Sequence, residues 1–135
     1  MKLIVITGQE GADADGLLRQ VIADNGYSYS EAPRMVFPER SNLLYHPRSL
    51  YNNVRKVVRD HIDNDEDLFV VTFSDYTMYG VRAEIRQADF EGAMLYQAES
   101  GGGFVISEID SNGKCRYING VFDVLRDALN EVLGW

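Results

Sequence analysis

Short, almost continuously apolar runs alternate along this chain with segments of helical periodicity. Residues 2–7 (KLIVIT) and 68–72 (LFVVT) are rich in β-branched residues, a pattern typical of strands buried on both faces of a parallel sheet. Residues 35–37 predict a third, shorter strand that ends before Pro38, since proline cannot continue a central strand. The pattern therefore predicts a βα-type core.

Helical patterns separate these runs. Apolar residues recur at helical spacing in three segments, residues 17–25, 49–63 and 76–87. Pro47 is expected at or just before the first turn of the second helix, where a missing N–H costs little. Ser74 or Asp75 is expected to cap the third helix.

The pattern changes after the third helix. Residues 92–98 and 103–109 predict two strands joined by a hairpin-like turn, and residues 121–133 predict a closing helix. The predicted fold class is α/β, a small, mainly parallel sheet with flanking helices, extended by a C-terminal β-hairpin and helix. We expect one domain over residues 1–135, with a core of about 1–88 and an extension of about 89–135.

Composition adds limits to this picture. The 45% hydrophobic and 25% charged content is ordinary for a globular domain. A single cysteine, Cys115, excludes an internal disulfide and favours a reducing compartment. No run approaches the ~20 apolar residues that span a bilayer, and the N-terminus lacks the order of a signal peptide. We therefore expect a cytoplasmic protein with no membrane association.

The net charge is −8, from 21 acidic and 13 basic residues. Binding to a phosphate backbone needs a basic face, so direct nucleic-acid binding is not expected. The excess of acid has two interpretations: it keeps the protein soluble, or it forms an acidic surface that mimics nucleic acid.

The loop after the first strand has the outline of a phosphate loop. A strand, a glycine-containing loop and a helix open many nucleotide-binding units, and Gly8 and Gly11 stand at the first and fourth loop positions. A working loop also needs a lysine for the phosphates and a Ser or Thr hydroxyl for Mg²⁺. Ala14 occupies the lysine position, Asp15 the hydroxyl position, and Asp13 the place of the preceding glycine.

These replacements change the electrostatics of the loop. A nucleoside triphosphate would meet Glu10, Asp13 and Asp15 with no cation nearby. Like charges ~4 Å apart repel by roughly 4 kcal/mol at an effective dielectric constant of about 20, whereas a helix N-terminus attracts an anion by only ~1 kcal/mol. ATP binding is therefore not expected. A divalent cation held by the carboxylates and a capped helix start without ligand stay open.

Residues 35–47 carry a family resemblance. Tyr45-His46-Pro47 follows an apolar strand that ends in Pro38-Glu39-Arg40. This segment resembles the Walker B and D-loop region of the overcoming-lysogenization-defect, RecF and SMC-like ABC ATPases, where the strand ends in Asp-Glu-Pro-Glu and Leu-His-Pro follows. The resemblance puts Glu39 at the Mg²⁺-coordinating aspartate and Arg40 at the catalytic glutamate.

Two later segments extend the resemblance. Thr72-Phe73-Ser74 is similar to the Thr-His-Ser-Pro switch motif of these ATPases, with Phe73 in place of the histidine. The tail sequences of residues 110–114 and 120–123 resemble the Asp-x-x-Gly-Lys and Gly-x-Phe-Asp elements of the same group. The resemblance thus covers nearly the whole chain, but the long segment with the Leu-Ser-Gly-Gly-like signature is missing.

The resemblance implies an ABC-type ATPase core whose hydrolytic residues are replaced. We expect a non-catalytic protein, without cofactor or metal, that docks on a full-length ATPase of this group or on a second copy and modulates it. Such ATPases often act in repair or phage defence, so a phage or mobile-element origin is expected. Two alternatives stay open: an acidic DNA mimic or anti-defence inhibitor, and an enzyme that binds a nucleotide or metal through an unusual loop.

Overall fold

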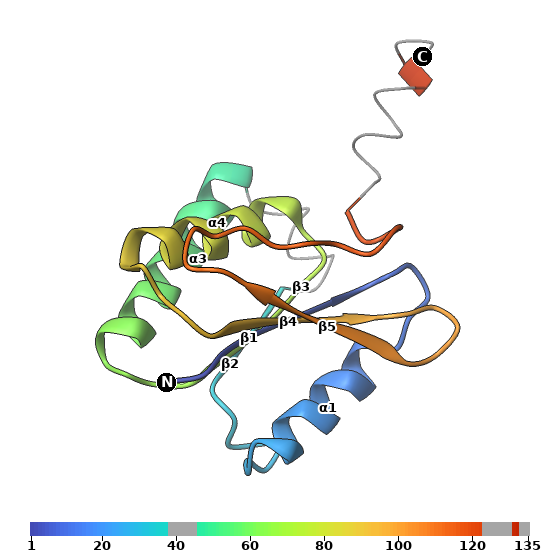
Figure 1. Ribbon diagram of the computed structural model, residues 1–135, viewed down its shortest axis with the longest axis horizontal. Coiled ribbons are helices and arrows are strands. Elements are labelled where there is room, and N and C mark those ends of the chain that lie inside the picture. The colour runs from blue at the N-terminus through green and yellow to red at the C-terminus, as the bar shows by residue number, and fades with distance from the viewer. Residues whose placement is uncertain (38–45, 123–130, 133–135) are drawn as a thin grey trace.

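The structure is a computed structural model that describes residues 1–37, 46–122 and 131–132 (Figure 1). The elements in chain order are β1 (Leu3–Gly8), α1 (Ala14–Asp24), β2 (Arg34–Phe37), α3 (Pro47–Asp63), β3 (Leu68–Thr72), α4 (Asp75–Ala88), β4 (Ala93–Ala98) and β5 (Phe104–Ile109). No helix in these described ranges is long and apolar enough to cross a membrane.

The strands form one five-stranded sheet in the order β2-β3-β1-β4-β5. All neighbouring pairs are parallel except β4 and β5, so the predicted α/β class with a mainly parallel sheet is confirmed. The predicted hairpin, however, is no appendage to a separate core. Its first strand lies beside β1, in parallel register from Ile4–Met94 to Gly8–Ala98.

Helices cover both faces of the sheet. Figure 1 shows α1 on one face and α3 with α4 on the other. Because successive strand residues point to opposite faces, Leu3 and Val5 of β1 pack toward α3 and α4, whereas Ile4 and Ile6 pack toward α1. The uninterrupted apolar runs of the sequence follow directly from this two-sided burial.

Two helices begin earlier than their apolar spacing predicted. The helix α1 begins at Ala14 rather than Leu17, because the Asp13 carboxylate accepts a hydrogen bond from Gly16 N at 2.8 Å and caps it. The helix α3 begins at Pro47, before its apolar spacing starts, and Pro47 stands in the first turn as predicted; His46 Nδ1 accepts from Arg48 N at 3.1 Å. Capping residues are polar, so a search for apolar periodicity misses the first turn.

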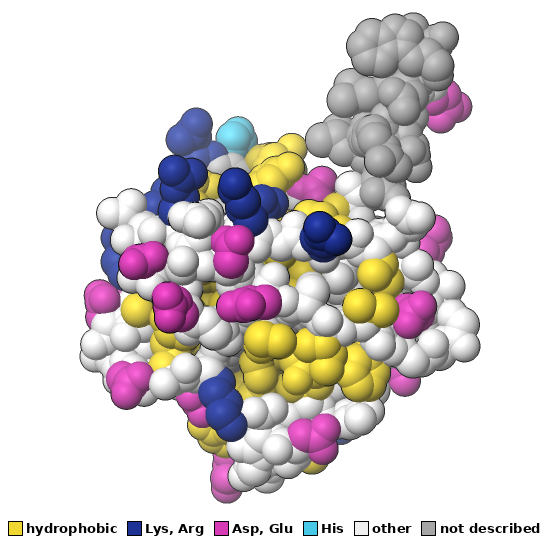
Figure 2. Space-filling model, in the orientation of Figure 1, with side chains coloured by type: hydrophobic (Ala, Val, Ile, Leu, Met, Phe, Trp, Pro, Cys, Tyr) yellow, Lys and Arg dark blue, Asp and Glu magenta, His cyan; other side chains and the backbone are white. Residues whose placement is uncertain are grey.

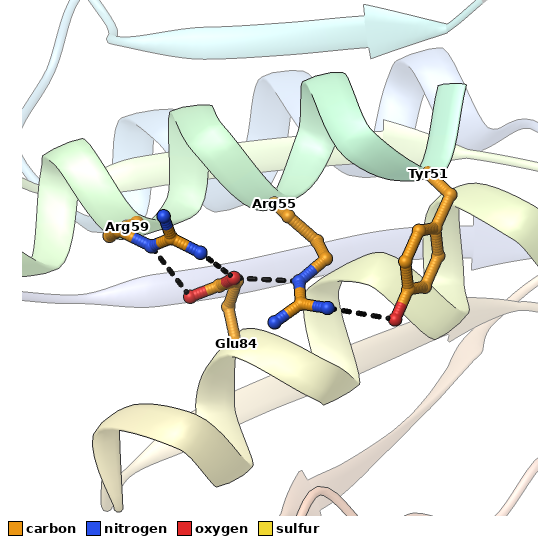
Figure 3. A network of polar contacts seen from close by, with 4 residues as sticks. All are labelled: Tyr51, Arg55, Arg59 and Glu84. Atoms are coloured by element: carbon orange, nitrogen blue, oxygen red, sulfur yellow. Dashed lines mark hydrogen bonds and ion pairs between the residues drawn. The ribbon is translucent and has the colours of Figure 1, made fainter. Parts of the chain in front are cut away.

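The helices α3 and α4 pack unusually closely. Gly80 of α4 faces α3 so tightly that a β-carbon there would lie 2.9 Å from the carbonyl oxygen of Tyr51. One turn further along α4, Oε1 of the buried Glu84 accepts hydrogen bonds from Arg55 Nε and Arg59 Nη2, each at 2.7 Å (Figure 3). A glycine contact and a buried ion pair therefore join the two helices.

The C-terminal part departs from the prediction at the closing helix. Residues 114–118 pass over β4, held by Gln97 through Arg116 O at 3.0 Å and Ile118 N at 2.9 Å. Val121 and Phe122 form a bend rather than the start of a helix. Of the rest of the predicted helix, residues 131–132 are helical, and residues 123–130 and 133 lie outside the described residues.

Candidate functional site

The loop between β1 and α1 lies at the carboxyl end of the sheet, where a phosphate loop would lie. Gly8 ends β1 beside Ala98 of β4, and Gly11 adopts a φ of 79° that favours glycine. The loop closes on itself through a hydrogen bond from Ala12 N to Gln9 O at 3.0 Å. The predicted order of strand, loop and helix is thus confirmed, and the loop ends at Asp13.

The N-terminus of α1 is already occupied by a carboxylate from its own chain. Asp13 is the N-cap, and its Oδ1 accepts from Gly16 N at 2.8 Å. A β-carbon on Gly16 would meet Asp13 Oδ2 at 2.3 Å, so the carboxylate lies tightly against the first turn. The helix N-terminus attracts anions through these N–H groups and its dipole. Asp13 therefore supplies the anion that a phosphate would otherwise provide.

The substituted positions bring no compensating positive charge. Ala14 is buried in the first turn of α1, so it contributes packing alone. Asp15 forms an exposed ion pair with Arg19, 3.0 Å between Oδ2 and Nε. Glu10 is exposed at the tip of the loop. Arg19 is thus committed to Asp15, and its guanidinium also stacks on Tyr29, 3.8 Å from the ring centre.

Gln9 ties the loop to two distant segments. Its Oε1 accepts from Ser100 N in the β4–β5 turn at 2.9 Å, and its Nε2 donates to Asn119 O at 2.8 Å. Its own backbone N donates to Ala98 O at 3.0 Å. A phosphate loop wraps its N–H groups around a ligand, whereas this loop uses the Gln9 side chain to hold its neighbours.

A cavity of about 410 Å³ opens between the start of α1 and the β4–β5 turn. Its walls combine two carboxylates with apolar and small residues: Asp13, Gly16, Leu17, Gln20, Ala98, Glu99, Gly102, Gly103 and Phe104. None of these wall residues is basic. The cavity thus has the size of a ligand site but the wrong charge for a phosphate.

The metal alternative has no support in the described part of the chain, where no three His, Cys, Asp or Glu side chains gather into a metal-binding group. Of the acidic loop residues, Asp13 caps α1 and Asp15 pairs with Arg19.

The switch-like residues lie at the carboxyl end of β3. Thr72 is fully buried, and its Oγ1 accepts from Ser74 N at 3.0 Å. Ser74 is the N-cap residue of α4 but makes no side-chain capping bond. Phe73 is 46% exposed, so the aromatic side chain at the switch position points to the surface.

The Walker B-like residues can be placed only in part. Glu39 and Arg40 lie outside the described residues, so their predicted positions stay predictions. His46 and Pro47 begin α3 as N-cap and first helical residue. His46 and Pro47 therefore have a local role at the start of α3.

Sequence reasoning missed a row of buried polar side chains across the carboxyl ends of three strands. Thr7 of β1 pairs with Gln97 of β4, and Thr72 follows Val71, which pairs with Ile6. All three are buried. The alternation of each strand puts them on the α3–α4 face. In the sequence, the feature that could have indicated this row is a single polar residue at the end of each apolar run.

This row lies at the topological switch point of the sheet. The crossover from β1 leads to α1 on one face, and that from β3 leads to α4 on the other. Ligands of open α/β sheets bind outside such strand ends. The buried Oγ1 atoms of Thr7 and Thr77 find no hydrogen-bond partner among the described residues, and burial raises the pKa of nearby Asp75. Of the described residues named here, the position offers hydroxyl and amide groups.

No protein-family model, curated protein or solved structure matches this chain. The structure shows a small α/β protein with a mostly parallel sheet. The resemblance to ABC-type ATPases stays a prediction from the motifs.

Proposed function

We propose that this chain is a non-catalytic protein of ATPase-like architecture that acts by binding another protein. The observation that carries the proposal is the Asp13 carboxylate on the N-terminus of α1, 2.8 Å from Gly16 N. It fills the place of a phosphate with a charge of the same sign. A triphosphate would have to displace this cap, which costs about 1 kcal/mol, and would still meet the carboxylates of Glu10 and Asp15.

The rest of the loop supports the same proposal. Ala14 lies buried where a phosphate-binding lysine is needed, and Gln9 holds the loop against the β4–β5 turn and Asn119. These contacts give the loop a structural role. The loop keeps the backbone position of a nucleotide-binding loop but lacks the positive charges that bind phosphate. This combination supports a protein that binds a partner through its surface and does not hydrolyse ATP.

The motif resemblance supplies the class of partner, a full-length ATPase of the overcoming-lysogenization-defect, RecF and SMC-like group. ABC-type domains act in pairs, so a chain of similar shape can occupy the place of one partner and modulate the other.

Affinity capture with the full chain as bait tests this proposal. We expect a purified ATPase of the resembled group to be retained in the presence and absence of nucleotide, and its hydrolysis rate to change when the chain is added. A bait with Asp13→Asn, which keeps a capping oxygen, should retain it equally well. Failure to retain any ATPase of this group, or no change in its rate, would contradict the proposal.

A further inference from the structure

The strand β5 forms one edge of the sheet, and no further strand of the described residues pairs with it. The order β2-β3-β1-β4-β5 ends with it, and its register partners all belong to β4. Edge strands present unpaired N–H and C=O groups that another strand can bind, and proteins commonly protect them with lysine, proline or a bulge. The β5 sequence FVISEI contains neither lysine nor proline, and its one charge is Glu108.

Exposed apolar side chains lie along this edge. We call Tyr96, Phe104 and Ile106 the β5 surface. Phe104 and Ile106 are 37% and 48% exposed; Tyr96 stacks on Phe104 with ring centres 5.9 Å apart and pairs with Ile106 across the strands. Figure 2 shows hydrophobic side chains gathered over this part of the molecule, on the side of α1. Tyr96 packs partly buried against the core cluster on the α1 side, whereas Phe104 and Ile106 stay exposed.

Negative charge surrounds the β5 surface on the same side. Glu108 lies opposite Met94 in the register, on the face that carries Ile106. At the other end, Phe104 lines the 410 Å³ cavity together with Asp13 and Glu99. Carboxylates therefore lie at both ends of the β5 surface. On the opposite face, Arg116 lies beside Ser107, whose Oγ donates to Arg116 O at 3.5 Å.

This arrangement of charge decides between the possible occupants. A second copy would bring another β5 that lacks a basic residue, and each chain carries a net charge of −8, so like charges would oppose the pairing. A strand with cationic residues beyond a short apolar centre would instead match the edge, the apolar surface and both acidic ends.

We propose that β5 binds an extended, basic segment of a partner protein, which adds to the sheet as a sixth strand. Main-chain hydrogen bonds along β5 supply the pairing, as in other cases of strand addition. Two apolar side chains of the segment contact Phe104 and Ile106, and the flanking Lys or Arg residues reach Glu99 or Asp13 at one end and Glu108 at the other. This inference rests on the proposed function, because it names where and what kind of protein segment binds.

Two capped heptapeptides test the inference directly. The basic probe is acetyl-Lys-Thr-Val-Thr-Ile-Thr-Lys-amide, and its acidic match carries Glu for both Lys residues. In ¹⁵N-labelled protein at low salt, we expect the basic peptide to shift the amide resonances of residues 104–109, to slow their hydrogen exchange, and to bind at least tenfold more tightly than the acidic peptide. A rise in salt should weaken its binding because the charges are exposed.

Protein variants separate charge from pairing. Glu99→Gln combined with Glu108→Gln should weaken the basic peptide about tenfold and leave the acidic one unchanged or improved. Glu91→Gln, an exposed carboxylate before the start of β4, is the matched control and should have no effect. Ile106→Lys adds a charge to the edge and should abolish binding without unfolding the protein, since Ile106 is half exposed.

Several outcomes would overturn the inference: equal affinity for the two peptides, shifts confined to residues outside β5, or no shift at millimolar peptide. If the protein sediments as a dimer and its β5 amides are already protected from exchange without peptide, β5 pairs with a second copy instead of a basic segment. The two proposals fail separately. Peptide binding without ATPase capture contradicts only the proposed function, and ATPase capture without peptide binding contradicts only this inference.

Discussion

Replacing Glu84 by alanine is expected to lower the free energy of unfolding by about 3 kcal/mol. The carboxylate side chain is 2% exposed and pairs with Arg55 and Arg59 at 2.7 Å. Its removal leaves two guanidinium groups without a counter-charge between α3 and α4. The estimate lies at the low end for a buried pair, because Arg55 and Arg59 are 28% and 54% exposed and stay partly hydrated. Urea unfolding measures the change.

The same group predicts how stability depends on pH. Burial acts to raise the pKa of Glu84, but hydrogen bonds and charge from Arg59 and Arg55 outweigh it and hold the pKa below its ordinary value. A carboxyl group with a lowered pKa in the folded state stabilises the fold above its unfolded pKa of about 4.3. This stability is lost as the pH falls through the folded value. Glu84→Gln should flatten the loss of stability below about pH 4.

The control for both measurements is Glu91→Ala, which removes an exposed carboxylate that lies outside the helix. Its effect should stay within about 0.5 kcal/mol. If Glu84→Ala changed the free energy of unfolding as little as this control does, the ion pair would not stabilise the packing of the two helices.

Replacing Gly80 by alanine is expected to destabilise the protein by about 2 kcal/mol net, against the usual preference of helices. Alanine gains about 1 kcal/mol over glycine inside a helix. Here, however, the added β-carbon would lie 2.2 Å from Val54 Cγ1 and 2.9 Å from Tyr51 O. The buried Val54 has little freedom to turn, because a β-branched side chain in a helix keeps one χ1 rotamer. The carbonyl oxygen belongs to the backbone of α3, so the helices must move apart at a cost of about 3 kcal/mol.

Whether Gly80→Ala raises or lowers the free energy of unfolding tests how closely α3 and α4 pack. Thermal or urea unfolding that shows a more stable Gly80→Ala protein would mean that α3 and α4 do not approach as closely as described. Gly101→Ala is the control: a β-carbon there meets nothing within 4 Å, and the change should be within about 0.5 kcal/mol.

Much of the fold could be predicted from the sequence because the strands are buried on both faces. The residues 68–72 matched β3 in full, since an uninterrupted apolar run needs a sheet covered twice. The order of strands could not be predicted in this way. The sequence of residues 92–98 does not indicate that β4 pairs with β1. Parallel neighbours are distant in the chain, so no short turn between them marks the pairing.

The loop between the first strand and the first helix could be predicted from the sequence, but the arrangement of its side chains could not. The glycines and missing lysine of the first loop predicted that Ala14 and Asp15 replace the phosphate-binding groups. That Asp13 turns its carboxylate onto Gly16 N depends on a side-chain rotamer, and the sequence gives only the residue type. The polar row of Thr7, Thr72 and Gln97 depends on register between three strands, which spacing along the chain does not contain.

Calorimetry with Mg²⁺-ATP measures whether the loop between β1 and α1 can hold a triphosphate. The comparison is between the natural chain and a variant with Asp13→Gly, Ala14→Lys and Asp15→Ser, which restores the charges of a phosphate loop. We expect no binding to the natural chain at a dissociation constant below about 1 mM, equivalent to roughly −4 kcal/mol, and measurable binding to the variant. Micromolar binding of Mg²⁺-ATP by the natural chain would contradict this expectation.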